Sequence, residues 1–473
     1  MKKIVEMKKV AEMKEVAEVK KDSTFLGTEK IGKLLFQLSL PAITAQLVNM
    51  LYNLVDRIYI GHIPVEGTLA LTGVGVCMPV ILLISAFAAL VSMGSAPRAS
   101  IHMGKGENYA AEKILGNSFI MLLIVGVILT IVMSIWGRDL LMLFGASENT
   151  IEYSLSYLNI YVIGTIFVQL TIGMNAFITA QGFAKIGMYS VLIGAVCNVV
   201  LDPIFIFVFD MGVAGAALAT ILSQAISAIW IIRFLCGKQT VLKLKKGNFR
   251  LKREVVLPSI VLGLAPFIMQ ATESLISICF NASLLKYGGD IAVGGMTILA
   301  SVMQFSLLPL VGLTQGAQPI ISYNYGARNI QRVKEAFITL LKCGLTFSTV
   351  MWLIVMLFPK AFTSIFTSDP ELIAFTSDAM HIYFAVSLLF GIQLACQQTF
   401  IAIGNAKTSL FLAVLRKIIL LIPLIYILPV LFTDKINAVY MAEPIADFIA
   451  VTVTGTIFIV QFKKILSIQK KTL

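Results

Sequence analysis

The chain has 473 residues, of which 58% are hydrophobic and 13% are charged, and its formal net charge is +12. About a quarter of the residues in an average soluble protein are charged, so this composition excludes an ordinary soluble protein. The positive charge does not require a nucleic-acid partner, because cytoplasmic loops of membrane proteins collect Lys and Arg, and anionic lipids attract these residues. We therefore expect membrane lipid, and no nucleic acid, as a partner.

The first 21 residues, MKKIVEMKKVAEMKEVAEVKK, differ from a signal peptide because charge continues throughout them and they contain no apolar core. Lys and Glu alternate with small and apolar residues over this stretch. We expect residues 1–33 to form a charged cytoplasmic tail.

Beyond this tail, apolar runs of about 20 residues recur along the chain, which is the length of a transmembrane helix. The chain is therefore predicted to be an all-α polytopic membrane protein with twelve transmembrane helices. The predicted spans lie near residues 34–60, 68–93, 114–136, 155–180, 187–209, 211–235, 255–283, 291–321, 336–358, 380–403, 408–432 and 440–462.

Lys and Arg cluster in the tail and in the connections after the second, sixth and eighth spans. Because cytoplasmic loops carry the excess of Lys and Arg, both termini are predicted to be cytoplasmic. The longest basic connection, residues 236–254, divides the chain into an N-lobe (34–235, helices 1–6) and a C-lobe (255–473, helices 7–12, ending in a short cytoplasmic tail).

An internal repeat supports this division into two pseudo-symmetric six-helix lobes. Four pairs of residues share one offset of 222: Gly94 and Gly316, Pro97 and Pro319, Gly104 and Gly326, and Gly182 and Gly404. Each predicted lobe has an even number of spans, so the two lobes have the same orientation. Transporters use such parallel repeats, related by an axis along the membrane normal, to rock around a central site.

The first predicted span contains a carboxylate, Asp56. Burying a charge at the centre of a bilayer costs roughly 2.5–3.5 kcal/mol on insertion scales, so such residues usually face a water-filled cavity. Tyr52 and Asn53 lie one helical turn earlier and share its face. The alternative is that Asp56 marks the end of the span at the level of the lipid headgroups.

A second carboxylate, Asp202, lies in the fifth span at a similar predicted depth, one turn after Asn198 and directly before Pro203. Two carboxylates in a poorly hydrated pocket resist joint ionisation, so one of them is expected to hold a proton near neutral pH. Asn175 and Thr220 are candidate polar partners from the fourth and sixth spans, and the alternative for each is a helix–helix hydrogen bond.

The second half does not repeat this pair: Pro423 corresponds to Pro203, but Ile422 stands where the first half has Asp202. It has its own intramembrane charges, namely Glu273, Arg416, Lys417, Glu443 and Asp447. Glu273 is predicted either to bind substrate or a cation, or to pair with a basic residue such as Arg416.

The sequence contains no HExxH, G-x-S-x-G or Walker motif, and its three histidines are too dispersed for a metal site. The six cysteines have no CxxC spacing and are expected to be buried hydrophobic residues. We therefore predict neither an enzyme nor a resident cofactor. Uphill transport by this chain would need an ion gradient or a separate ATPase.

Four stretches, LPAI…MLYNLVDRIYIG, the paired G-x-x-P-x6-G elements, GMNAFITAQG and NVVLDPIFIF, resemble the multidrug and toxic compound extrusion (MATE) family, in its prokaryotic DinF-like and MepA-like branch. The resemblance extends from Ile31 to Leu466. It implies two six-helix lobes around a central cavity in a prokaryotic plasma membrane. It also implies export of amphipathic, mainly cationic drugs by alternating access, in antiport with H⁺ or Na⁺.

The resemblance further implies an ion- and proton-coupling site formed by Asp56, Asn175, Asn198, Asp202 and Thr220, with Tyr52 nearby. Asp56 and Asp202 would bind the metal ion only if the coupling ion is Na⁺. Tyr52, Asn53 and Glu273 are the candidate cavity residues for substrate, and the protein is expected to be a monomer. A lipid-linked oligosaccharide flippase of the same superfamily is the alternative function; it would need several cations in the cavity, for which Arg416 and Lys417 are the only candidates.

Overall fold

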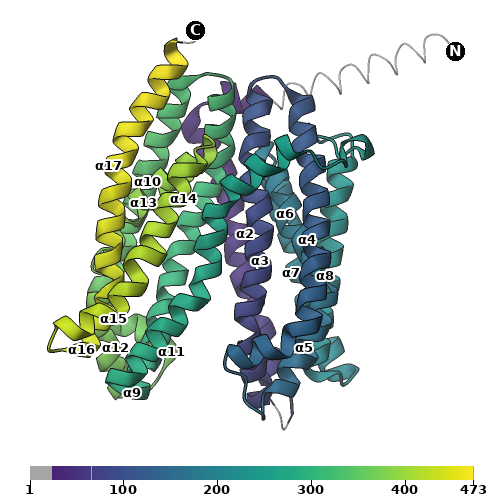
Figure 1. The fold of residues 1–473 in the computed structure, drawn as a ribbon. Helices are drawn as coiled ribbons and strands as arrows, with labels where there is room; N and C mark the ends of the chain where they lie inside the picture. The colour runs from purple at the N-terminus through teal and green to yellow at the C-terminus, as the bar shows by residue number, and fades with distance from the viewer. Residues whose placement is uncertain (1–23, 65–66, 472–473) are drawn as a thin grey trace.

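The computed structural model describes residues 24–64 and 67–471, and this part of the chain contains helices and no strands (Figure 1). Residues 1–23, which make up most of the predicted charged tail, lie outside the described residues. The described end of that tail is packed against the protein, because Leu26 is fully buried beside Ile320 and Phe400.

The described first half of the chain contains α-helices and a π-helical turn. They are α2 (Ile31–Gly61), α3 (Gly67–Gly104), α4 (Asn108–Leu143), α5 (Ile151–Ile163), α6 (Thr165–Ala180), α7 (Ala184–Pro203), the π-helical turn Ile204–Val208, and α8 (Gly212–Cys236).

The second half follows after the 3₁₀ turn Lys246–Asn248. Its elements are α9 (Arg253–Gly326), α10 (Ile330–Leu357), α11 (Pro359–Phe366), α12 (Pro370–Tyr383), the 3₁₀ turn Ser387–Leu389, α13 (Phe390–Ala402), α14 (Ala406–Val414), the π-helical turn Leu415–Leu421, α15 (Ile422–Leu431), α16 (Lys435–Tyr440) and α17 (Ala442–Lys471). Figure 1 shows the two halves as two bundles standing side by side.

Twelve membrane spans, as predicted, follow from these elements. Nine helical segments of the described chain are long and apolar enough to cross a membrane, and two bent helix pairs raise the number to eleven. The 74-residue α9 is interrupted at Gly289, whose positive φ of 63° is not helical, so α9 supplies two spans and completes the twelve.

The spans predicted near 155–180 and 380–403 are bent helix pairs in the structure. The chain bends by 57° between α5 and α6 and by 49° between α12 and α13. Gly164 forms the first bend, and a Cβ there would lie 2.4 Å from the Ile221 side chain. The bend therefore depends on close contact with α8, which apolar periodicity does not reveal.

Large apolar side chains cover the outside of the bundles. Ile135 is 62% exposed and Val430 is 77% exposed. Exposure of this extent on membrane-length helices is explained by contact with lipid, because hydrocarbon takes the place of water around the spans.

The turns at the helix ends repeat with the offset of 222. Gly182 and Gly404 both have positive φ, of 91° and 78°. Gly106 and Arg328, also 222 residues apart, have φ values of 78° and 57°. Matching left-handed turns show that the two halves fold in the same way at these positions, although one partner is an arginine.

The two bundles meet along α2, α3 and α9. At Gly94 of α3 a Cβ would lie only 1.9 Å from the Ser259 carbonyl oxygen of α9. At the corresponding Gly316 of α9 a Cβ would lie 2.3 Å from the Ser39 hydroxyl of α2. The first two spans of each bundle therefore approach the other bundle at backbone distance.

Candidate functional site

Asp56 and Asp202 approach each other inside the first bundle. Asp56 lies on α2 and Asp202 on α7, and these two helices pack side by side. Their carboxyl groups lie within hydrogen-bonding range of each other. Asp56 is 8% exposed and Asp202 is fully buried. An ionised carboxylate only accepts hydrogen bonds, so a hydrogen bond between the two requires a proton on one of them.

Asn198 connects this carboxyl pair to α8. Its Nδ2 donates to Asp202 Oδ1 at 3.0 Å, one turn along the same helix. The same Nδ2 approaches Thr220 Oγ1 of α8 at 3.4 Å. The spacing of four residues in α7 therefore puts an amide donor on the carboxylate, and α8 supplies the next polar group.

Two tyrosines of α5 complete the surroundings of the pair. The Tyr157 side chain lies close to Thr220. Tyr157 is 4% exposed, and its ring stacks on Tyr161 with the centroids 5.9 Å apart. Sequence reasoning missed both residues, because a tyrosine in a transmembrane helix is common at interfaces and nothing in the spacing links α5 to α7 or α8.

Several oxygen atoms of this cluster remain without a donor. Asp56 Oδ1, Asp202 Oδ2 and Asn198 Oδ1 are buried and have no hydrogen-bond partner among the described residues. Buried polar atoms are usually paired, so a group of unpaired oxygens needs an explanation. A proton on the carboxyl pair would supply a donor, and a hard cation such as Na⁺ prefers carboxylate and amide oxygens of this kind.

The other predicted residues of this site lie around the pair in different ways. Tyr52 is half-buried near both carboxylates. Asn53 donates to the Asn49 carbonyl oxygen of its own helix at 2.7 Å. Asn175 Nδ2 donates to the Gly187 carbonyl oxygen at 3.3 Å, eleven residues before Asn198 on α7, and no hydrogen bond joins it to the carboxyl pair.

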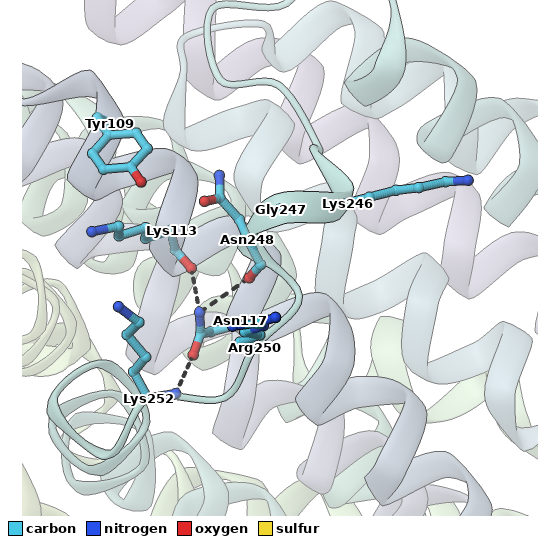
Figure 2. Close-up of a pocket in the computed structure, with 8 residues that line it drawn as sticks. All are labelled: Tyr109, Lys113, Asn117, Lys246, Gly247, Asn248, Arg250 and Lys252. Atoms are coloured by element: carbon cyan, nitrogen blue, oxygen red, sulfur yellow. Dashed lines mark hydrogen bonds between the residues drawn. The ribbon is translucent and has the colours of Figure 1, made fainter.

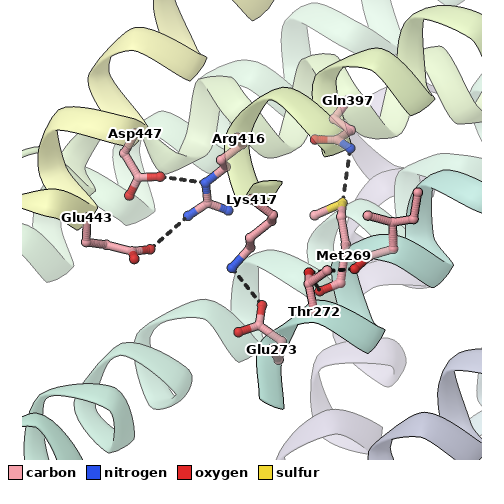
Figure 3. A network of polar contacts seen from close by, with 9 residues as sticks. Met269, Thr272, Glu273, Gln397, Arg416, Lys417, Glu443 and Asp447 are labelled. Atoms are coloured by element: carbon pink, nitrogen blue, oxygen red, sulfur yellow. Dashed lines mark hydrogen bonds and ion pairs between the residues drawn. The ribbon is translucent and has the colours of Figure 1, made fainter. Parts of the chain in front are cut away.

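The second bundle contains a charged cluster instead (Figure 3). Arg416 Nε donates to Asp447 Oδ1, and Arg416 Nη2 approaches Glu443 Oε1 at 3.4 Å. Lys417 Nζ forms an ion pair with Glu273 Oε1 at 2.8 Å. The basic partner of Glu273 is thus Lys417, and Arg416 is occupied by the two acids of α17.

The cluster contains three carboxylates and two cations, so it has one more carboxylate than cation when all five groups are ionised. Four of the side chains are between 3% and 11% exposed, whereas Glu273 is 52% exposed. Arg416 also lies over the Phe390 ring, 5.6 Å from its centroid. Glu273 is therefore the member that an outside ligand can reach, and both basic groups already contact carboxylates.

The described residues contain no group of three or more His, Cys, Asp or Glu side chains arranged to hold a metal ion. The six cysteines form no disulfide. Cys77, Cys279 and Cys396 are buried as expected, but Cys197 is half-buried and Cys236 and Cys343 are exposed, so the expectation that all six are buried is wrong.

Comparisons with known proteins find relatives of the chain. A family model described as MatE matches residues 41–204 and 266–427, one stretch in each half of the chain. The chain is 24% identical over 423 residues to multidrug export protein MepA of Staphylococcus haemolyticus, which covers 89% of this chain and 92% of that protein.

Two solved structures extend the likeness to the fold. One is described as the outward-facing conformation of a multidrug resistance MATE family transporter of the MOP superfamily; it has a TM-score of 0.87 and 25% identity and covers 94% of this chain and 98% of that one. The other is a MOP superfamily transporter of Pyrococcus furiosus, with a TM-score of 0.86, 25% identity and coverage of 95% and 98%. Its description states that the reverse polarity of its binding pocket suggests a different function.

Proposed function

Because the chain belongs to the MatE family of membrane transporters, we propose that it is a secondary multidrug exporter of the bacterial plasma membrane. It expels amphipathic, mainly cationic compounds in exchange for H⁺ or Na⁺. A relative described as a multidrug export protein supports the export of drugs. The observation that carries the coupling mechanism is the buried contact between the carboxyl groups of Asp56 and Asp202.

The carboxyl pair couples drug export to the flux of H⁺ or Na⁺ because its charge affects the binding of both the drug and the coupling ion. With a single proton or no bound cation, the pair is negative and attracts a lipophilic cation into the lobe. When a second proton or a Na⁺ ion binds, this negative charge is neutralised and the attraction falls. Asn198 donates a hydrogen bond to Asp202, and the same amide group contacts Thr220. Alternating access then releases the drug on one side and the coupling ion on the other.

Tyr52 and the half-exposed Glu273 are the proposed contacts for substrate, one from each lobe. Tyr52 offers an aromatic face to an organic cation. Glu273 offers a carboxylate, whose charge is shared with Lys417 at 2.8 Å. Apolar cavity walls discriminate weakly between hydrophobic ligands, which is consistent with a broad substrate range.

The charged cluster argues against the flippase alternative. Recognition of a lipid-linked diphosphate requires cations that are free to contact it. Arg416 is bound by Asp447 and Glu443, and Lys417 is bound by Glu273. The carboxylates outnumber the cations in this cluster, so an organic cation fits it better than a diphosphate does.

The test is efflux of ethidium from proteoliposomes driven by an imposed pH gradient or an imposed Na⁺ gradient. Asp56→Asn and Asp202→Asn are each expected to reduce gradient-driven efflux at least tenfold. Asp290→Asn, the same substitution at an exposed site where α9 is interrupted, serves as the matched control and should leave efflux unchanged. The gradient that drives efflux identifies the ion, and undiminished efflux in both carboxylate variants would refute the coupling proposal.

A further inference from the structure

The basic connection between the lobes is fastened to the N-lobe rather than hanging free. Gln181 Oε1, at the end of α6, accepts hydrogen bonds from Val241 N at 2.9 Å and from Leu242 N at 2.8 Å. Asn117 of α4 donates to the Asn248 carbonyl oxygen at 3.3 Å and accepts from Lys252 N at 2.8 Å (Figure 2). These contacts hold the connection against the end of α6 and against α4.

A pocket of about 370 Å³ lies between α4 and this connection. Four cationic residues line it, namely Lys113, Lys246, Arg250 and Lys252, and no acidic residue does. Figure 2 shows that Lys113 and Lys252 extend on the same side as Asn248 and Tyr109, whereas Lys246 extends away from them. The pocket therefore concentrates positive charge in a partly enclosed space.

The acidic residues close to Lys113 and Tyr109 on α4 are already paired. Glu112, next to Lys113 on α4, forms an ion pair with Lys245 at 2.7 Å and accepts from Lys243 N at 3.2 Å. Glu107 contacts His102 at 2.6 Å. The charge of the pocket cations is thus not balanced by a carboxylate in the pocket wall.

A buried donor points to a ligand independently of these charges. Asn248 is 7% exposed, and its Nδ2 has no hydrogen-bond acceptor among the described residues. An unpaired buried donor costs about 1–3 kcal/mol. The cations of the pocket cannot relieve this cost, because ammonium and guanidinium groups have no acceptor atom. An anionic oxygen would satisfy both the amide and the cations.

Apolar groups lie beside this polar pocket. Phe249 stacks on Phe119 of α4 with the ring centroids 5.2 Å apart, and the neighbouring Leu251 is 46% exposed. Tyr109, which lines the pocket under the Lys113 ammonium group, is 65% exposed. Exposed aromatic and aliphatic groups next to Lys and Arg are typical of the depth at which lipid headgroups meet acyl chains.

We propose that this pocket binds a phosphate group, and that the phosphate belongs to the headgroup of an anionic phospholipid of the inner leaflet. Lys113, Arg250 and Lys252 neutralise the phosphate, Asn248 Nδ2 donates a hydrogen bond to it, and Phe249 and Leu251 contact the acyl chains. A lipid held here bridges α4 and the connection between the lobes. Lipid composition thereby affects how firmly the connection is held against the N-lobe.

The test measures lipid retention by native mass spectrometry of the purified full-length protein in detergent. Phosphatidylglycerol and phosphatidylcholine are added in parallel, and inorganic phosphate is added as a competitor. The wild-type protein is expected to retain phosphatidylglycerol at least tenfold more than phosphatidylcholine. The triple variant Lys113→Gln/Arg250→Gln/Lys252→Gln is expected to lose this preference.

The matched control is Lys185→Gln/Lys334→Gln/Lys407→Gln, which removes the same charge from the same end of the bundle, at the beginnings of α7, α10 and α14. Equal retention of phosphatidylglycerol by the two triple variants would overturn the proposal. A second variant, Asn248→Asp, changes one buried donor to an acceptor and keeps the test decisive if the triple variant does not fold. It is expected to retain tenfold less phosphatidylglycerol than the wild-type protein.

Inorganic phosphate separates the two sources of the phosphate group. One outcome is that millimolar inorganic phosphate stabilises the delipidated protein and that the protein shows no preference for phosphatidylglycerol. This outcome would overturn the assignment to lipid and assign the pocket to a free phosphate. Preference for phosphatidylglycerol that survives millimolar phosphate supports the lipid. None of these measurements depends on transport, so their outcome is separate from that of the proposed function.

Discussion

Gly104 at the end of α3 and Gly326 at the end of α9 each lie against the backbone of the other's helix. A Cβ on Gly104 would lie 1.9 Å from the Tyr323 carbonyl oxygen, and a Cβ on Gly326 would lie 1.9 Å from the Ile101 carbonyl oxygen. Tyr323 and Ile101 are themselves 222 residues apart, like the two glycines. The contact is therefore reciprocal, as at an isologous two-fold interface. The corresponding segments of the internal repeat contact each other where the lobes meet.

This contact predicts that Gly104→Ala forces the ends of the two helices apart. Overpacking of this kind typically costs about 1–3 kcal/mol. The melting temperature of the detergent-solubilised protein should therefore fall. Gly455→Ala in α17 is the control, since no atom lies within 4 Å of a Cβ there and alanine favours a helix. A Gly104→Ala variant as stable as Gly455→Ala would show that the lobes separate at this point without cost.

The N-lobe site predicts a difference between its two asparagines. Asn198→Ala removes the donor to Asp202 and leaves a buried carboxylate oxygen unpaired, whereas Asn175→Ala removes only a hydrogen bond to the Gly187 carbonyl oxygen. An unsatisfied buried acceptor costs about 1–3 kcal/mol. We expect gradient-driven ethidium efflux to fall about tenfold in Asn198→Ala and less than threefold in Asn175→Ala. Equal losses would place Asn175 functionally within the carboxyl cluster.

The C-lobe cluster predicts that Arg416→Ala destabilises the protein strongly. Removing the guanidinium leaves Glu443 and Asp447 buried without a cation, and breaking a buried ion pair in this way costs roughly 3–5 kcal/mol. The exposed pair of Lys33 and Glu29, which are 56% and 42% exposed, is the control. Lys33→Ala should cost about 0–1 kcal/mol. Chemical denaturation in detergent compares the two variants, and similar losses would mean that water reaches the Arg416 site.

A pH effect is expected at the turn between α3 and α4, outside the spans. The hydrogen bond from His102 lowers the pKa of Glu107 from its usual 4.5. A carboxyl group with a lowered pKa stabilises the folded state above its unfolded pKa, and this stabilisation is lost as the pH falls through the folded value. The wild-type protein should therefore melt at a slightly higher temperature than Glu107→Gln at pH 6, and the difference should shrink as the pH falls below 4.5. A difference that stays constant over this range would exclude the carboxylate as its cause.

Some features of the site followed from local sequence rules. Asn198 and Asp202 share a face because an α-helix brings residues i and i+4 together, and the structure joins them by a hydrogen bond of 3.0 Å. The twelve spans followed from runs of apolar residues long enough to cross a bilayer. The offset of 222 anticipated the matched turns at Gly182 and Gly404.

Other features depend on contacts between helices that no local rule describes. From the sequence we expect a basic residue such as Arg416 as the partner of Glu273, and only packing assigns Lys417 to it. Tyr157 lies close to Thr220 and belongs to α5, which ends at the bend at Gly164. That bend depends on the Ile221 side chain of α8.

The sequence by itself determined the membrane class, the number of spans, the repeat and the two intramembrane aspartates, because hydropathy and helical period are properties of neighbouring residues. Only the tertiary structure decided that Asp56 and Asp202 touch, that Asn175 bonds elsewhere, and that the basic connection forms a pocket with α4. These relationships join residues that are 146, 12 and 131 positions apart in the chain. The packing of whole helices brings such residues together, and that packing depends on every side chain between them.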